Sequence, residues 1–302
     1  MSKQRPMKSI VVDWLLATIL AAVLCTTPTW AHAGLVGLLI EHAAMHSVEH
    51  GIEHHVRESR AEAGAPALPQ TQDFRACPQF FPGGIPFDVT KVDPAWKPRA
   101  LCFKSFAVLY SGLAKAPLLV FERLSRQTLT SKVARTENFF PDPRIPRNER
   151  AELSDFAGSY PKWERGHMAP AADQYDLETM AGCFSLANMV VQDGQNNEHQ
   201  WAKIESDTRK FALRASGDVY TTSGPKFEYA GAPRTLGRGQ VWIPTTLFKF
   251  VYDEASGRSW AHIIPNTADA VVGPPTTYAG FVQSTGWSLL ANVPVQTQLA
   301  RH

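Results

Sequence analysis

One segment of the chain carries polar, charged or aromatic residues at intervals of four positions: Asn197, Trp201, Glu205 and Arg209. An α-helix has about 3.6 residues per turn, so residues four apart drift by only about 40° and share one broad face. The Asp193-Gly194 pair before them is typical of a turn, and Asn196 or Asn197 is expected to cap the helix. The spacing therefore predicts a helix with an amide, an indole, a carboxylate and a guanidinium on one face.

A second motif, the run Glu164-Arg165-Gly166-His167, lies thirty residues before this helix. Hydrolysis of a phosphodiester needs a base for water, a cation for the charge on the phosphate and a donor for the leaving oxygen. His167 is the candidate base, because a neutral imidazole titrates near physiological pH. Asn197 is the candidate metal ligand, because Mg²⁺ prefers oxygen and keeps several of its waters.

Each of these residues also has a structural interpretation when it is taken alone. His167 could be a hydrogen-bonded structural residue, Asn197 a helix cap and Trp201 part of the core. Glu205 and Arg209 could form an ordinary ion pair on a helix surface. The hydrolytic interpretation is favoured because chance agreement of all four spacings with the upstream motif is rare.

These motifs resemble those of the DNA/RNA non-specific endonuclease family, the ββα-metal nucleases, over roughly Cys77 to the C-terminus. The family's Asp-Arg-Gly-His signature is matched by Glu164 to His167 and continues into Met168-Ala169-Pro170. Its Ser-Asn segment and its Asn-x-x-x-Trp-x-x-x-Glu helix are matched by Ser185 to Met189 and by Asn197, Trp201 and Glu205. Arg209 falls at a helix arginine of the family, and Arg135 with residues 140–146 matches more loosely a segment that supplies another arginine.

The resemblance implies a mixed α+β fold, with a central antiparallel sheet and a ββα-metal (His-Me finger) active-site unit. It implies that His167 activates water, Asn197 binds one divalent metal and Glu205 orients metal-bound waters. The remaining site residues would contact phosphate or support the histidine: Arg165, Arg135, Arg209 and Asn188. One departure is Glu164, which stands where the family usually has aspartate and leaves the rate and metal preference open.

The same resemblance implies that the substrates are DNA and RNA, cut with little sequence preference to 5′-phosphate ends. Low specificity follows if contacts go to phosphate and sugar, which carry no base information. The expected cofactor is Mg²⁺, with Mn²⁺ or another divalent cation as alternatives. An inhibitor protein of unknown identity is a further candidate partner.

The first 33 residues have the features of a secretory signal peptide. Three basic residues precede an apolar run from Ile10 to Leu24, and Ala31-His32-Ala33 follows as a cleavage site. We therefore expect a periplasmic or secreted protein with no stable membrane span after cleavage. The alternative is an uncleaved membrane anchor.

The remainder of the chain is electrically balanced, with 27 basic and 27 acidic residues after the first 33. This balance does not support a broad polycationic surface for nucleic acid. A local cluster would have to supply the attraction, and the candidates bracket the proposed site: Arg135, Arg144, Arg147, Arg150, Lys162 and Arg165. Without the motif, such a cluster would be interpreted as a solvated surface.

Residues 34–72 are expected to form a His-rich helix and a linker, followed by one enzyme domain over residues 73–302. Histidines at steps of four form a stripe, at His42, His46, His50 and His54. Such pairs can chelate Zn²⁺ or Ni²⁺, but a polar tether whose histidines pair with nearby glutamates is the favoured interpretation.

Three cysteines remain after the first 33 residues. Cys77 and Cys102 are expected to form a disulfide in an oxidising compartment, and this pairing also fits the cysteine segments of the family. Cys183 is left over and is expected to be buried.

The coarse pattern of the rest is that of a mixed α+β domain. Runs of β-branched and aromatic residues predict strands at Ala107–Tyr110, Leu118–Glu122, Asp218–Thr222, Gln240–Ile243, Leu247–Tyr252 and Trp260–Pro265. The segment from Asp173 to Thr179 could begin a short helix or lie in a loop. Three functions remain open: a nuclease, a metal-binding protein with an inactive nuclease-like domain, and a nucleic-acid-binding accessory protein.

Overall fold

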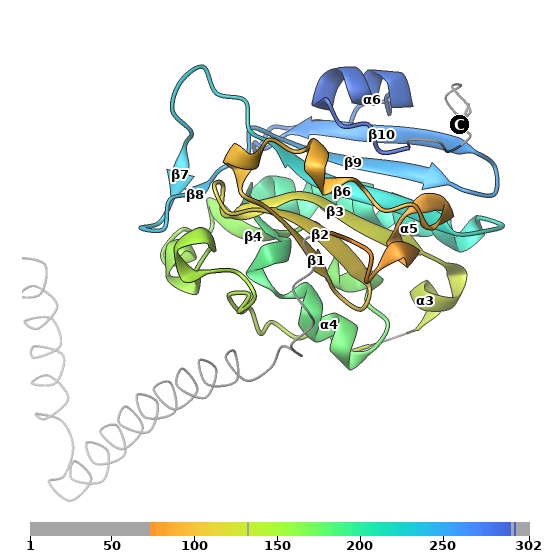
Figure 1. The fold of residues 1–302 in the computed structure, drawn as a ribbon, viewed down its shortest axis with the longest axis horizontal. Coiled ribbons are helices and arrows are strands. Elements are labelled where there is room, and N and C mark those ends of the chain that lie inside the picture. The colour runs from red at the N-terminus through yellow and green to blue at the C-terminus, as the bar shows by residue number, and fades with distance from the viewer. Residues whose placement is uncertain (1–72, 132, 291–292, 294–302) are drawn as a thin grey trace, which may run out of the picture. The chain divides into compact units, whose positions relative to one another are not determined.

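A six-stranded antiparallel sheet forms the centre of the computed structural model, which describes residues 73–131, 133–290 and 293. The expected signal peptide and histidine stripe lie outside these residues. The strand order is β1-β2-β3-β6-β9-β10, and every neighbouring pair is antiparallel (Figure 1). The strands are β1 (Pro98–Cys102), β2 (Phe106–Ser111), β3 (Ala116–Leu124), β6 (Val219–Lys226), β9 (Thr246–Asp253) and β10 (Arg258–Pro265).

Alternation along the strands gives this sheet two covered faces. In β9, Phe248 and Phe250 point to one face, whereas Leu247 and Lys249 point to the other. The first face packs against N-terminal 3₁₀ turns and helix α6 (Tyr278–Thr285). These turns are η1 (Pro78–Phe80), η2 (Pro82–Gly84), η3 (Val89–Lys91) and η4 (Pro94–Trp96).

The second face of the sheet packs against a strand hairpin and its helix. Strands β4 (Trp163–His167) and β5 (Met189–Asp193) pair antiparallel and form a separate two-stranded sheet. A π-helical segment (Asn196–Trp201) and helix α5 (Ala202–Arg214) follow β5. Further short elements surround this ββα arrangement: α3 (Arg126–Thr130), α4 (Leu177–Cys183), η5 (Arg147–Glu149), η6 (Leu153–Phe156), η7 (Ala171–Asp173) and η8 (Leu186–Asn188).

The expected mixed α+β class and central antiparallel sheet are therefore confirmed, and most predicted strands lie within observed ones. The exception is Gln240–Ile243, where only β8 (Val241–Trp242) forms and pairs with β7 (Thr235–Leu236) as a short hairpin. Tyr175 and Asp176 lie outside regular structure, because Asp176 caps α4 through the backbone amide of Thr179. The open choice over Asp173 to Thr179 thus resolves into a 3₁₀ turn, a short connection and the start of a helix.

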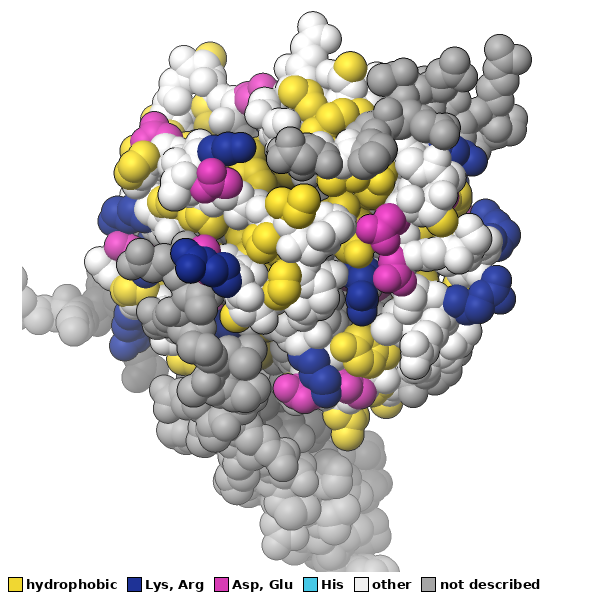
Figure 2. All heavy atoms as spheres, turned by 45° about the vertical axis from the view of Figure 1, so that its right-hand side comes forward, with side chains coloured by type: hydrophobic (Ala, Val, Ile, Leu, Met, Phe, Trp, Pro, Cys, Tyr) yellow, Lys and Arg dark blue, Asp and Glu magenta, His cyan; other side chains and the backbone are white. Residues whose placement is uncertain are grey.

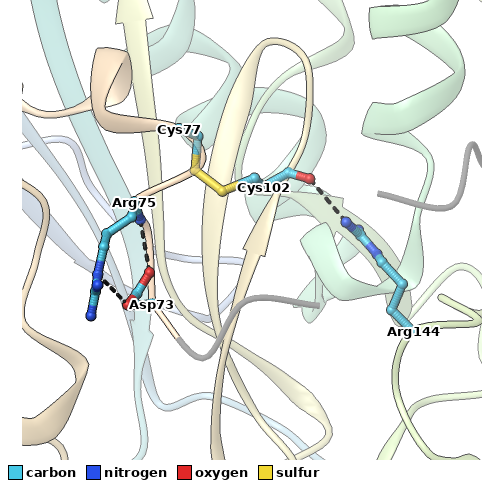
Figure 3. The surroundings of a disulfide bond; sticks show 5 residues. All are labelled: Asp73, Arg75, Cys77, Cys102 and Arg144. Carbon is cyan, nitrogen blue, oxygen red and sulfur yellow. Dashed lines mark hydrogen bonds and ion pairs between the residues drawn. A yellow bond between two sulfur atoms is a disulfide. The ribbon is translucent and has the colours of Figure 1, made fainter. Parts of the chain in front are cut away.

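The predicted disulfide between Cys77 and Cys102 is confirmed, with 5.9 Å between the two Cα atoms (Figure 3). It ties the segment before η1 to the end of edge strand β1. The backbone oxygen of Cys102 also accepts a hydrogen bond from Nη1 of Arg144 at 2.9 Å. Cys183 is a buried free thiol as expected, and burial raises the pKa of that thiol above its usual value.

Acidic and basic side chains are interspersed on the face of the molecule that Figure 2 shows, with apolar side chains between them. This face therefore carries no continuous basic area. Within the described residues, none of the helices combines the length and the apolar character needed to cross a bilayer.

Candidate active site

Strand β4 carries the Arg-Gly-His motif, and its close pairing with β5 explains the glycine. A Cβ atom added to Gly166 would lie 1.9 Å from Oε1 of Gln192 on β5. Gln192 is fully buried and donates from Nε2 to Oδ1 of Asn196 at 2.9 Å, so it cannot easily move aside. The glycine therefore allows the hairpin to close directly beside the start of the helical segment.

The helical segment begins differently from the sequence expectation. The predicted cap at Asn196 or Asn197 is wrong, because Oδ1 of Asp193 accepts from the backbone amides of Gln195 and Asn196 at 3.1 and 3.3 Å. The carboxylate that was assigned to a turn thus satisfies the first amides of the helix. The side-chain amide of Asn197 is therefore not used as a cap and can make another contact. It lies in a π-helical turn, which is often found at functional sites.

Two side-chain hydrogen bonds fix this helical segment along β4. Nδ2 of Asn197 donates to Oε2 of Glu164 at 2.8 Å, and Nε1 of Trp201 donates to the backbone oxygen of His167 at 3.3 Å. Trp201 is almost fully buried, which confirms its expected place in the core. The helical segment that carries Asn197, the candidate metal ligand, therefore contacts strand β4 at both Glu164 and His167, the first and last residues of the motif.

His167 lies in an aromatic surrounding and is only 9% exposed. Its ring centre is 4.9 Å from that of Phe184 and 5.8 Å from that of Phe139. Among the described residues, Nε2 of His167 is a buried nitrogen with no hydrogen-bond partner. Burial, followed by the charges of Arg135 and Arg165, lowers the pKa of His167 to about 3. The imidazole is consequently neutral at physiological pH and can accept a proton.

Two of the predicted arginines lie near the same two aromatic rings that surround His167. The guanidinium of Arg165 lies 4.0 Å from the centre of the Phe139 ring, and that of Arg135 lies 5.6 Å from the centre of the Phe184 ring. Arg135 is largely exposed and lies 3.7 Å from a carboxylate oxygen of Glu137. Both cations are therefore placed close enough to the histidine to attract an anion there.

Three other members of the predicted basic cluster lie beside carboxylates of their own segment. Arg144 forms a buried ion pair with Asp142 at 2.7 Å, and Arg150 pairs with Glu152 at 3.0 Å. Arg147 lies 3.8 Å from the same glutamate. The charges of Arg144 and Arg150 are therefore paired within their own segment, whereas the side chain of Arg147 is largely exposed.

Asn188 supports the backbone that follows the histidine. Its Oδ1 accepts from the backbone amide of Ala169 at 2.8 Å, and its Nδ2 donates to the oxygens of Ala169 and Cys183, each at 2.9 Å. The side chain is fully buried, so every one of these bonds is made to the protein. Asn188 therefore holds the loop after His167 in place, as a supporting residue.

Glu205 and Arg209 on α5 lie over a buried charged cluster that the sequence reasoning missed. Lys249 on β9 is fully buried, donates to Oγ of Ser223 at 2.9 Å and lies 3.7 Å from Oε2 of Glu122. Arg209 donates to Oδ1 of Asp173 at 3.1 Å. A sequence signal exists, because Glu122 directly follows the apolar run 117–121 and Lys249 lies between Phe248 and Phe250.

Burial governs the protonation of this cluster. It raises the pKa of Glu205 to about 7, with the charge of Lys249 acting in the opposite direction. It also raises the pKa values of Glu122 and Asp173, again against the charge of nearby cations. The charges of Lys249 and Arg209 therefore offset only part of the effect of burial on these carboxyl groups.

The donor atoms around the helical segment fit a hard divalent cation. Asn197 uses its amide nitrogen for Glu164, so its oxygen is the atom that remains for a cation. Burial raises the pKa of Glu164, and the hydrogen bond from Asn197 lowers it. Among the described residues, no three His, Cys, Asp or Glu side chains converge to hold a metal. A cation that retains much of its water, as Mg²⁺ does, is compatible with so few ligands.

Comparison with known proteins places these motifs in a family. A model of the DNA/RNA non-specific endonuclease family matches residues 89–296. The mitochondrial nuclease EXOG of Homo sapiens is 32% identical over 190 residues, which cover 56% of this chain and 50% of that protein. The mitochondrial Nuclease 1 of Schizosaccharomyces pombe is 28% identical over 265 residues, covering 79% of this chain and 77% of that protein. The chain thus spans about half the length of the EXOG relatives.

A solved structure has the same fold. Its title describes an EndoG/EndoGI complex and the mechanism of EndoG inhibition. The TM-score is 0.57 at 21% sequence identity, and the match covers 73% of this chain and 91% of that one.

The relatives also correct the expected localisation. EXOG, Nuclease 1 and the endonuclease G of Bos taurus are all named as mitochondrial proteins, so the prediction of a periplasmic or secreted protein is wrong. The physical reason is that a basic N-terminus is common to secretory and mitochondrial targeting segments, so basic residues alone do not separate the two routes.

Proposed function

Because the chain belongs to the DNA/RNA non-specific endonuclease family, we propose that it hydrolyses phosphodiester bonds of DNA and RNA with a divalent metal and leaves 5′-phosphate ends. One observation carries the proposal. His167 is a buried, neutral histidine whose Nε2 has no partner among the described residues, and two arginines flank it. An unpaired acceptor beside two cations suits a reaction in which water attacks an anionic group.

In this proposal, His167 takes a proton from the attacking water at Nε2. The low pKa of the histidine keeps the imidazole neutral, and in this role its one proton would lie on Nδ1 and leave Nε2 as the acceptor. The negative charge of a bound phosphate would raise the pKa toward a useful range. The backbone oxygen of His167 is held by Trp201, which limits movement of the base. A well-oriented base is effective because the cost of positioning is met before the reaction.

Asn197 would hold the metal through its side-chain oxygen, with the carboxylates of Glu164 and Glu205 orienting water around it. When bound, a Mg²⁺ ion supplies positive charge to the phosphate and to the leaving oxygen. The hydrogen bond between Glu164 and Asn197 supports this role for the longer acidic side chain, because the carboxylate still reaches the amide. The identity of the metal is part of the proposal.

Arg165 and Arg135 would bind the phosphate that is cleaved, and Arg209 would add a third positive charge from α5. These contacts would be made to the sugar-phosphate backbone. Contacts of this kind support activity on both DNA and RNA with little sequence preference. An inhibitor protein as partner stays a prediction.

The test uses the full chain with supercoiled plasmid and with a long RNA. Both should be degraded with Mg²⁺ and remain whole with EDTA, and the new ends should carry 5′-phosphate. His167→Ala should abolish cutting and leave binding of nucleic acid in EDTA largely unchanged. The matched control is His262→Ala, which removes a partly exposed histidine of β10 and should cut like the wild type.

Three results would contradict the proposal in different ways. Cutting by His167→Ala at the wild-type rate would exclude this histidine as the base. Retention of plasmid without cleavage would favour the nucleic-acid-binding alternative. Tight zinc binding with intact plasmid would favour the metal-binding alternative.

A further inference from the structure

Two cationic side chains lie close to the indole ring of Trp163 on β4. Neither belongs to the residues that the proposed function places at the cleaved phosphate. Nζ of Lys162 lies 4.8 Å from the ring centre, and the guanidinium carbon of Arg234 lies 5.8 Å from it. Lys162 also pairs with Asp193. Arg234 is exposed, and among the described residues its guanidinium is matched with the ring rather than with a carboxylate.

This group lies on the same face of β4 as the candidate active site. Side chains two apart on a strand point to the same side, so Trp163, Arg165 and His167 share one face. At about 3.3 Å per residue, Trp163 is roughly 13 Å along the strand from His167. That separation corresponds to about four steps of a duplex strand, which rises roughly 3.4 Å per nucleotide.

Arg234 is held in this place by a well-anchored hairpin, β7–β8, which Figure 1 shows close to β4. The backbone oxygen of Arg234 accepts a hydrogen bond from the backbone amide of Ile243 at 2.9 Å. The turn of the hairpin is fixed by buried Asp155, whose Oδ1 accepts from the amide of Gly239 at 2.6 Å. Trp242 in β8 packs edge-on against Trp96, with 5.4 Å between ring centres.

We propose that Arg234, with Lys162 and Trp163, forms a second nucleic-acid contact that binds a backbone phosphate about four nucleotides from the one cleaved. This inference rests on the proposed function. An exposed arginine supported by an aromatic ring suits a phosphate, because the planar guanidinium can stack on the ring and donate from its edge. Such a contact lengthens the bound stretch of substrate without reading its sequence.

The experiment compares a long and a minimal substrate for the wild type and Arg234→Ala. With a 30-base-pair duplex, kcat/KM should fall roughly three- to tenfold, as expected when one charge-assisted phosphate contact is lost. With a dinucleotide, which contains one phosphodiester, kcat/KM should be unchanged because the substrate cannot reach Arg234. Arg234→Lys should recover part of the loss, since the charge remains and the planar stack does not.

A binding measurement in EDTA tests the contact without cleavage. The affinity for the duplex is measured over a range of salt concentrations, and the slope of log K against log salt should decrease in magnitude by about 0.9 for Arg234→Ala. The control is Lys91→Ala, which removes an exposed cation of η3 beside the opposite face of the sheet. This variant should match the wild type with both substrates.

The outcomes separate the contact from the proposed function. An unchanged salt slope and unchanged duplex cleavage by Arg234→Ala would overturn the inference, as would equal losses with both substrates. A wild type that cuts neither substrate would refute the proposed function, and the binding measurement would still decide whether Arg234 contacts nucleic acid.

Discussion

The buried neutral state of His167 should make the protein lose stability in mild acid. The folded-state pKa is about 3, against 6.5 for an unperturbed histidine. As the pH falls below 6.5, the unfolded chain therefore binds a proton that the folded protein excludes. The stability contributed by this histidine is fully present above pH 6.5 and is lost as the pH falls toward 3.

The size of the effect follows from the shift in pKa. One pH unit well below 6.5 corresponds to about 1.4 kcal/mol, and the histidine of the unfolded chain is already half protonated at pH 6.5, so lowering the pH from 6.5 to 4.5 should cost about 2 kcal/mol through His167 alone. Carboxyl groups also titrate in this range, and comparison with a variant removes their contribution. His167→Gln keeps a polar side chain of similar size and cannot gain the proton.

The assay is equilibrium unfolding in urea at several pH values between 4.5 and 7.5, with the disulfide intact. The difference in unfolding free energy between wild type and His167→Gln should change by about 2 kcal/mol between pH 6.5 and 4.5, in favour of the variant at low pH. His199→Gln, at an exposed position, controls for the removal of a histidine and should keep the wild-type pH dependence. Parallel curves for wild type and His167→Gln would refute the buried neutral histidine.

Three further predictions concern residues around the same site. Burial raises the pKa of Glu205 to about 7, so kcat/KM should increase about tenfold per pH unit below pH 7 and be constant above it. The Glu205→Gln variant should not show this change of slope at pH 7. Asn188→Ala should lower the unfolding free energy by about 3 kcal/mol or more, because three buried backbone groups lose their partner, whereas exposed Asn148→Ala should stay within about 0.5 kcal/mol. Gly166→Ala should cost about 2 kcal/mol in urea unfolding, because its Cβ would overlap buried Gln192; wild-type stability would show that the hairpin can open at this point.

Elements that depend on local periodicity could be predicted from the sequence. Strands β2, β3, β6, β9 and β10 were found because their β-branched and aromatic residues form continuous runs. Helix α5 followed from the steps of four, and burial of Trp201 followed from the size and apolar character of its ring. The motif residues Glu164 and Asn197 contact each other, although thirty-three residues separate them in the chain.

Features that depend on long-range partners could not be predicted in this way. The cap by Asp193 was missed because aspartate is equally suited to a turn and to a helix start. The structural roles of Arg144 and Arg150 depend on carboxylates that fold back onto them. Lys249 meets Ser223 and Glu122 only because β9 and β3 both pair with β6.

The β4–β5 hairpin has no backbone ladder to the six-stranded sheet. Side chains join the two parts instead, through an apolar cluster that includes Val190 and Val120 and through buried Asn266. Asn266 donates to the oxygens of Val191 and Pro244 and accepts from the amide of Asp193. A unit attached in this way can open as a cooperative block while the sheet stays folded. Hydrogen exchange should therefore be faster in β4 and β5 than in β3 and β6, and inactivation by denaturant should precede global unfolding.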